Sequence, residues 1–201
     1  PVGENIKTRW ASEVNPSSPL PEYPRPQMVR GEWMNLNGLW NYGITESHAV
    51  AFDSEGQILV PYPIESALSG VGKRVEKNQA LWYEREFTLP KKWAGKDVLL
   101  NFGAVDWHAE VYVNDRCVGE HKGGYDPFSF NITPYLNKSG KQVIKVKVMD
   151  ATDNSYQPRG KQCIINKSIW YTPVTGIWQT VWLEPVNKDH IENYYAVSDI
   201  D

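Results

Sequence analysis

Carboxylates are the side chains in this sequence best suited to acid–base chemistry. Two of them held about 5–9.5 Å apart across a cleft can act as general acid and as base or nucleophile. The candidates are Glu84, Glu86, Asp106, Glu110 and Asp126. They fall on alternating faces of expected strands or in turns, and nothing in their spacing marks two of them as a pair. The residues alone therefore predict no catalytic pair in this chain.

The sequence also lacks the spacing patterns of metal sites and of catalytic nucleophiles. The four histidines form no H-E-x-x-H pair, there is no G-x-S-x-G turn, and Gly70-Val-Gly72-Lys73 lacks the remaining positions of a phosphate loop. Cys117 lies in an expected apolar strand and Cys163 follows 46 residues later, so we expect free thiols or at most one disulfide. The aspartates at 150 and 153 could contribute oxygens to a structural Ca²⁺, but their pattern favours a strand-end turn. No metal and no cofactor is predicted from these patterns.

A long expected loop, from Gln157 to Pro173, carries the best candidates for binding. Its polar and aromatic members are Arg159, Lys161, Gln162, Trp170 and Tyr171. An aromatic face suits the C–H side of a pyranose ring, and guanidinium and amide groups can bond to its hydroxyls. Loops of this length on a rigid scaffold are often binding loops. The alternative, that these side chains bond only to protein, stays open.

Composition excludes several other classes of function. The 201 residues carry a net charge of −3, which gives no long-range attraction to a phosphate backbone and argues against nucleic-acid binding. No apolar run approaches the roughly 18 residues that span a bilayer, so no membrane contact is expected. The first residues do not have the pattern of a signal peptide. With 41% hydrophobic and 22% charged residues, the chain has an ordinary globular composition.

Short strands must position these side chains. Residues 107–113 and 144–148 alternate apolar and polar side chains with period two, which is typical of half-buried strands. Further β-rich runs cover 81–89, 98–102 and 177–183, with glycine and asparagine turns between them. Only 91–95 has the pattern of a short helical turn. The spacing predicts an all-β fold, a mainly antiparallel sandwich or barrel.

The chain divides into three parts. Residues 1–26 end in a stretch with five prolines and predict an extended arm, which we expect to lie along its own domain rather than serve as an SH3 ligand. Residues 27–186 hold the strand pattern. Residues 187–201 begin with a polar hinge and continue into a strand-like run at 191–197, which predicts a linker and the start of a second domain.

Several motifs occur in a specific order across residues 22–186. They are Pro24-Arg-Pro-Gln27, Trp33-Met-Asn-Leu-Asn-Gly-Leu-Trp40, Leu81-Trp-Tyr-Glu-Arg-Glu-Phe87, Phe102-Gly-Ala-Val-Asp-Trp107, Val111-Tyr-Val-Asn114, Gly123-Gly-Tyr-Asp-Pro-Phe128 and Gly176-Ile-Trp-Gln-Thr-Val-Trp-Leu183. In order and spacing they resemble the N-terminal part of glycoside hydrolase family 2 enzymes, the β-galactosidase, β-glucuronidase and β-mannosidase group.

That resemblance implies a jelly-roll β-sandwich of the galactose-binding kind over 27–186, followed by an immunoglobulin-like domain and a (β/α)₈ barrel. The two catalytic glutamates would lie in the barrel, so this chain alone is expected to be inactive. Its implied role is to support the barrel and to lend loops to a sugar subsite. A freestanding carbohydrate-binding module is the alternative. The resemblance further implies a bacterial periplasmic or secreted enzyme that acts on carbohydrate, with homo-oligomerisation left open.

Two positions bear on the implied sugar site. Asn78, just before the motif at Leu81, occupies the position of a sugar-contacting asparagine in β-galactosidases. Where those enzymes have an aspartate that helps to hold a sodium ion, this sequence has Ser168, Ile169 and Trp170. A sodium or calcium ion in the full-length enzyme is therefore unsupported by these residues, and so is strict galactosidase specificity.

Overall fold

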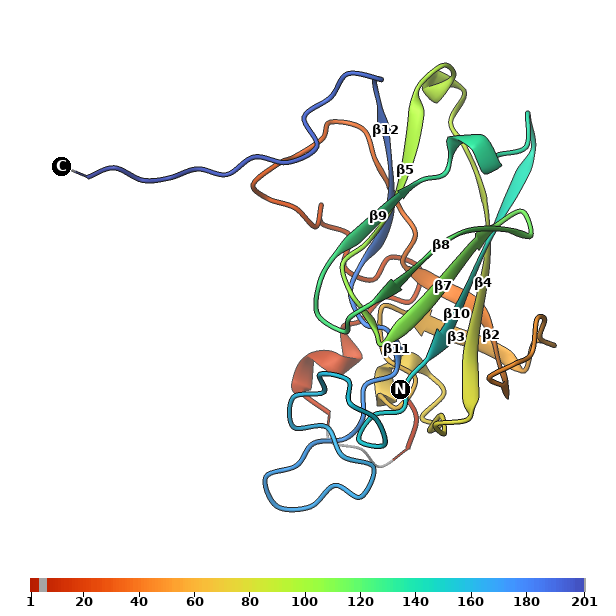
Figure 1. Cartoon of the computed structure of the whole chain (residues 1–201), viewed down its shortest axis with the longest axis vertical. Helices are drawn as coiled ribbons and strands as arrows, with labels where there is room; N and C mark the ends of the chain where they lie inside the picture. Colours follow the sequence, from red (N-terminus) through yellow and green to blue (C-terminus); the bar gives the residue numbers. More distant parts are fainter. Residues whose placement is uncertain (4–6, 201) are drawn as a thin grey trace.

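The computed structural model describes residues 1–3 and 7–200, and it is a two-layer antiparallel β-sandwich (Figure 1). The larger sheet has the order β3-β2-β4-β10-β7-β8. Its strands are β2 (Gly38–Glu46), β3 (Gly56–Val60), β4 (Gln79–Thr88), β7 (His108–Val113), β8 (Arg116–Lys122) and β10 (Lys141–Met149). The all-β sandwich expected from the strand pattern is confirmed.

The smaller sheet faces it and has the order β1-β12-β5-β9. Its strands are β1 (Met34–Asn35), β5 (Asp97–Phe102), β9 (Phe128–Asn131) and β12 (Val181–Val186). A two-stranded ladder of β6 (Val105–Asp106) and β11 (Gly176–Ile177) lies near one end of the sandwich. Four short 3₁₀ turns complete the described secondary structure: η1 (Arg9–Ser12), η2 (Ala67–Ser69), η3 (Lys91–Trp93) and η4 (Thr133–Tyr135).

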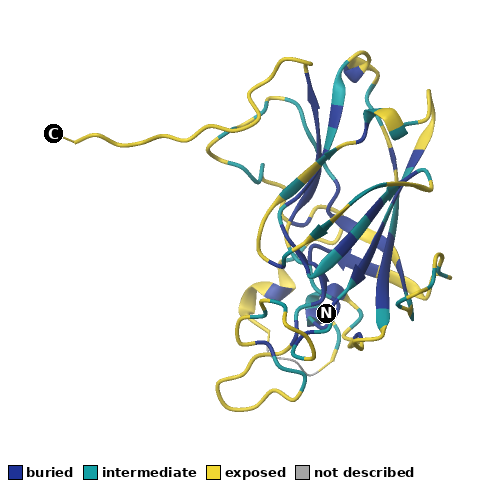
Figure 2. Ribbon diagram, viewed as in Figure 1, coloured by how far each residue is buried: buried dark blue, intermediate teal, exposed yellow. Residues whose placement is uncertain are grey.

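The core lies between the two sheets, where alternate side chains of each strand meet. On β7, Ala109, Val111 and Val113 are fully buried, while the side chains between them face outward and are half-buried. Leu100 and Leu183 face them from the smaller sheet. Figure 2 shows this pattern as buried strands between exposed connecting loops. Because both inner faces are apolar, burial of these side chains is the main stabilising contribution.

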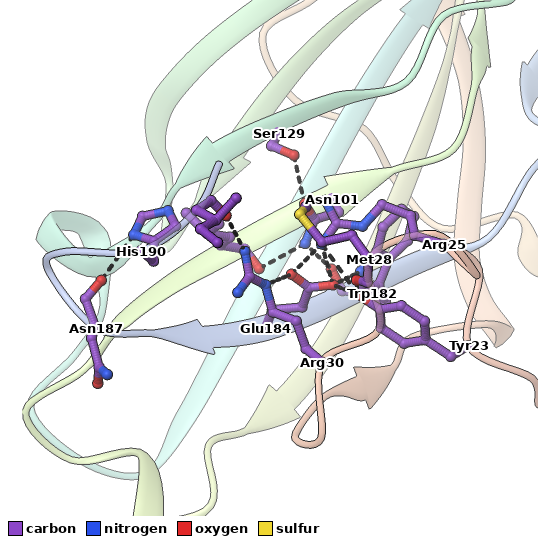
Figure 3. A network of polar contacts seen from close by, with 12 residues as sticks. Tyr23, Arg25, Met28, Arg30, Asn101, Ser129, Trp182, Glu184, Asn187 and His190 are labelled. Carbon is purple, nitrogen blue, oxygen red and sulfur yellow. Dashed lines mark hydrogen bonds and ion pairs between the residues drawn. The ribbon is translucent and has the colours of Figure 1, made fainter. Parts of the chain in front are cut away.

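The proline-rich arm lies along the outer face of the smaller sheet. The Asn35 amide donates to the carbonyl of Leu20 over 2.8 Å. Further along, Glu184 on β12 is fully buried and accepts from Arg25, Arg30 and Tyr23 (Figure 3). The arm therefore covers an outer sheet face that would otherwise expose a carboxylate.

Two expectations need correction. Cys117 is exposed, because β8 is an edge strand with a neighbour on one side only, and both cysteines are free. The single run expected over 177–183 is two strands, β11 and β12, which belong to different ladders.

The strand-like run at 191–197 has no strand pairing, and the tail runs out from the sandwich (Figure 1). Over the residues the structure describes, no helix has the length and apolar character to span a membrane.

Candidate functional site

The connection between β10 and β11, residues 150–175, folds at one end of the sandwich, beside η1 and the β3–β4 loop (Figure 1). It contains the loop predicted to bind. Inside it, the Tyr171 amide donates to the Lys161 carbonyl over 2.8 Å, and the Cys163 amide donates to the Tyr171 carbonyl over 3.0 Å. These two bonds form an isolated parallel bridge between Gln162 and Tyr171. The bridge brings the start and the end of the predicted binding loop side by side.

This arrangement forms two cation–aromatic pairs from four of the predicted residues. The Arg159 guanidinium lies 5.6 Å from the centre of the Trp170 ring, and the Lys161 ammonium lies 6.0 Å from that of Tyr171. Trp170 is 39% exposed and Tyr171 is 63% exposed. Both rings therefore offer surface to solvent next to a hydrogen-bond donor. An apolar face beside charged donors is the combination that binds a sugar ring and its hydroxyls.

Asp153 holds the arginine of the first pair. Its Oδ2 lies 3.5 Å from Arg159 Nη1 and accepts from the Cys163 thiol over 2.9 Å. The hydrogen bond from Cys163 lowers the pKa of Asp153, and the same bond raises the pKa of Cys163. Asp153 is therefore anionic near neutral pH and Cys163 is a thiol, so the arginine has an ionic partner within the loop connection.

Gln162 differs from the other loop candidates because it is only 8% exposed. Its Nε2 donates to Oδ2 of Asp106 over 2.8 Å, and its Oε1 accepts from the Val174 amide over 2.6 Å. Both ends of its amide thus bond to protein. Gln162 joins the loop to β6 rather than facing solvent.

Asn78 directly precedes β4, whose first part pairs with the last part of β10, so it lies at the same end of the large sheet as the start of the loop connection. Its side-chain amide donates to Oε2 of Glu46 over 3.3 Å, and its backbone carbonyl accepts from the backbone amide of Ser47. Its side chain is exposed. The structure therefore brings together Arg159, Lys161, Trp170 and Tyr171, and it leaves Asn78 apart from that group.

A group of buried carboxyls beneath the loop was not predicted as part of the site. Thr175 joins two of them: its amide donates to Glu65 over 2.9 Å, and its hydroxyl donates to Asp150 over 2.9 Å. Asp106 is the third. Burial raises the pKa of Glu65 and that of Asp106 to about 7 each. No sequence spacing joins these residues, because they come from three separate loops or strands.

The described residues contain no group of three or more histidine, cysteine or acidic side chains placed to hold a metal ion. The stretch that would hold sodium offers the exposed residues Ser168, Ile169 and Trp170, none of which is a carboxylate. These residues do not fit a sodium or calcium site. Two of the carboxylates considered as catalytic bond to neighbouring side chains: Glu86 pairs with Lys141, and Glu110 accepts from Tyr112.

Comparison with known proteins identifies the class. Residues 39–184 match the family described as glycosyl hydrolases family 2, sugar binding domain. The chain belongs to that family. It is 30% identical over 172 residues to a β-galactosidase of Thermoanaerobacter pseudethanolicus, covering 83% of this chain and 22% of that protein. It is 32% identical over 119 residues to a β-glucuronidase of Formosa agariphila, covering 58% of this chain and 12% of that protein.

A solved structure shows the same relationship. The crystal structure of Bacteroides uniformis β-glucuronidase superposes with a TM-score of 0.58 at 29% identity, covering 78% of this chain and 18% of that one. The chain thus spans less than a quarter of the length of each of these relatives. The predicted resemblance to family 2 is confirmed.

Proposed function

We propose that this chain is the non-catalytic N-terminal domain of a glycoside hydrolase that cleaves O-glycosidic bonds. Its partners in the same polypeptide would be an immunoglobulin-like domain and a (β/α)₈ barrel, and its ligand a carbohydrate. Family membership and the names of the relatives, β-galactosidase and β-glucuronidase, support a hydrolase parent. A periplasmic or secreted bacterial location and assembly of the parent into a homo-oligomer belong to the same proposal.

The observation that carries a sugar-contacting role is the pair of cation–aromatic contacts on the 157–173 loop. Arg159 with Trp170 and Lys161 with Tyr171 place two flat apolar faces and two cationic donors on one exposed loop. On a rigid sandwich, such a loop can complete a subsite whose other half comes from a neighbouring domain. Half a subsite makes few of the bonds of the whole, so the isolated chain would bind monosaccharides at a Kd of about 1 mM or weaker, roughly 4 kcal/mol.

Two measurements test this function. The first is hydrolysis of p-nitrophenyl β-galactoside and β-glucuronide by the pure chain. No turnover is expected, because retaining chemistry needs two carboxylates in one cleft. Turnover that disappears in Glu84→Gln, Glu110→Gln or Asp126→Asn would show that the chain has its own active site.

The second measurement is calorimetric titration of the pure chain with galactose, glucuronate and a short oligosaccharide. Binding in the millimolar range, weakened further in Trp170→Ala, supports a shared subsite. Micromolar binding of the oligosaccharide favours the second candidate, a freestanding carbohydrate-binding module, since the two exposed rings would then suffice as a platform. Lys138→Ala, at an exposed turn just before β10 and therefore at the opposite end of that strand from the loop, serves as the control.

A further inference from the structure

Three buried carboxyls anchor the loop that carries the exposed aromatic rings. Asp106 is 2% exposed and Asp150 is 2% exposed, and Glu65 is buried beside them. Gln162 and Thr175 connect this group to the two ends of the loop: Gln162 bonds to Asp106, and Thr175 bonds to Asp150 and Glu65. Gln157 adds a third connection, because its Nε2 donates to Oδ1 of Asp150 over 2.6 Å.

Among the described residues, the groups that donate hydrogen bonds to Asp106 and Asp150 are all neutral. Oδ2 of Asp106 accepts from an amide, and Asp150 accepts from amides and hydroxyls. Oδ1 of Asp106 is buried, without a hydrogen-bond partner among the described residues, against the backbone at Gly124. Burial favours the protonated carboxyl at that position, because no charge is then left uncompensated, and this outweighs the bond from Gln162, which favours the ionised form.

Among the described residues, no cation bonds to Asp106 to offset the cost of ionising it. Charged or titratable side chains lie on every surrounding element. They include Tyr83 on β4, His121 and Asp126 beside Gly123, Tyr125 beside Gly160, Lys7 at the rim of a cavity that Glu65 also lines, and Asp153, Arg159, Lys161, Cys163 and Tyr171 in the loop. Burial raises the pKa of Tyr83, so it stays neutral. Asp150 raises the pKa of both Glu65 and Asp106 further by its charge, in addition to burial.

We propose that Asp106, Asp150 and Glu65 position the 157–173 loop through Gln162 and Thr175 as a proton-dependent latch. The latch is tightest when Asp106 and Glu65 hold protons and loosens when they lose them. When the loop opens, Asp106 and Glu65 are exposed to water and their pKa values return to the ordinary range. The equilibrium constant for loop opening is therefore lowest below about pH 4, the ordinary pKa of these groups. It rises by up to tenfold per pH unit for each of the two groups and levels off above the raised pKa of about 7.

Amide hydrogen exchange on the whole chain tests the latch. Exchange of residues 157–173 is followed from pH 5 to pH 7.5 and corrected for the intrinsic pH dependence of exchange. We expect protection of this loop to fall at least tenfold over that range, while amides of 109–113 in the core strand β7 keep theirs. In Asp106→Asn, which cannot ionise, the fall should be less than a third of that in the wild type.

Glu86→Gln is the matched control, because it removes a carboxylate from an exposed ion pair with Lys141 and should leave the wild-type pH dependence unchanged. Constant loop protection in the wild type, an equal fall in Asp106→Asn, or parallel loss of protection in β7 would each overturn the latch. If Asp106→Asn does not fold, the wild-type comparison of loop and β7 still decides. Hydrogen exchange is measured without sugar, so failure of the latch is distinguishable from failure of the proposed sugar contact. Only the consequence of the latch for sugar binding rests on the proposed function.

Discussion

Gln162 and Asp106 are 56 residues apart in the sequence, yet the amide of one donates to the carboxyl of the other over 2.8 Å inside the protein. The other end of the Gln162 amide accepts from the Val174 backbone. One side chain therefore joins β6, the first part of the binding loop and the segment that leads into β11. This connection explains why a loop with so many exposed residues has a defined position.

Removal of this connection should cost stability. Gln162→Leu leaves a buried carboxyl and a backbone amide without their partner, which typically costs about 1–3 kcal/mol per unsatisfied group. Urea unfolding followed by tryptophan fluorescence measures the loss. Lys161→Leu is the control at the next position, since the Lys161 side chain is exposed and should change the free energy of unfolding by less than about 0.5 kcal/mol. Equal effects of the two changes would contradict a structural role for Gln162.

Gly176 should tolerate no side chain. It has φ +95°, and a Cβ there would lie 2.0 Å from the Tyr83 hydroxyl, itself fully buried between the sheets. Gly140 has a similar φ of +82° but no heavy atom within 4 Å of its Cβ position. Gly140→Ala therefore isolates the conformational cost, about 1–2 kcal/mol. We expect Gly176→Ala to lower the free energy of unfolding by at least about 2 kcal/mol more than Gly140→Ala, measured by urea denaturation, and a smaller difference would show that Tyr83 moves freely.

The sandwich could be predicted because its signal is local. Alternation over 107–113 matches β7, and the runs at 98–102 and 81–89 match β5 and β4 closely. The division of 177–183 between β11 and β12 could not be predicted, since both pieces are apolar and only their pairing partners differ. Cys117 was misplaced for a related reason: a strand's position at the sheet edge depends on topology, which local pattern does not contain.

The site could be predicted only in part. Arg159, Lys161, Trp170 and Tyr171 share one loop, so their proximity follows from the sequence. The position of Gln162 depends on Asp106, and the buried carboxyls gather from the β3–β4 loop, β6 and the end of β10. Such long-range contacts leave no spacing pattern. Whether Asn78 and the loop residues touch sugar stays a prediction.

The carboxylate under the arm should make stability sensitive to acid. Burial of Glu184 alone would raise its pKa, but hydrogen bonds from Tyr23, Trp182 and Arg25 lower the pKa below its ordinary range. A carboxylate with a lowered folded pKa contributes stability above its unfolded pKa, and that contribution is lost as the pH falls through the folded value. The melting temperature should therefore fall as the pH is lowered below about 4.

Glu184→Gln tests the same network at neutral pH. It leaves Arg25 and Arg30 against a neutral amide, and breaking a buried pair on one side typically costs about 3–5 kcal/mol. Glu120→Gln, which removes an exposed partner of His108, is the control and should cost less than about 1 kcal/mol. A neutral effect of Glu184→Gln, together with an unchanged acid midpoint, would show that this network does not hold the arm and that other contacts do, such as the bonds from Asn35 and Asn37 to the arm carbonyls.

Trp170 separates a sugar-contacting role from a structural one. It lies on the loop with 39% of its surface exposed, whereas Trp40 in the core is 1% exposed. Truncation of a buried tryptophan typically costs about 3–5 kcal/mol, so Trp40→Ala should lower the melting temperature strongly. Trp170→Ala loses an exposed ring and its contact with Arg159, so the melting temperature should move little.

In the full-length enzyme, we expect Trp170→Ala to lower kcat/KM by about tenfold or more, equivalent to about 1.4 kcal/mol of transition-state stabilisation. Trp170→Phe keeps a flat apolar face and should retain most of the activity. A role of Trp170 in positioning the Arg159 charge alone would not explain that result. Both quantities are measured on the same preparation, by steady-state kinetics and by thermal unfolding. A lower melting temperature with unchanged kcat/KM would place Trp170 among the structural residues and leave the loop without a demonstrated part in the sugar subsite.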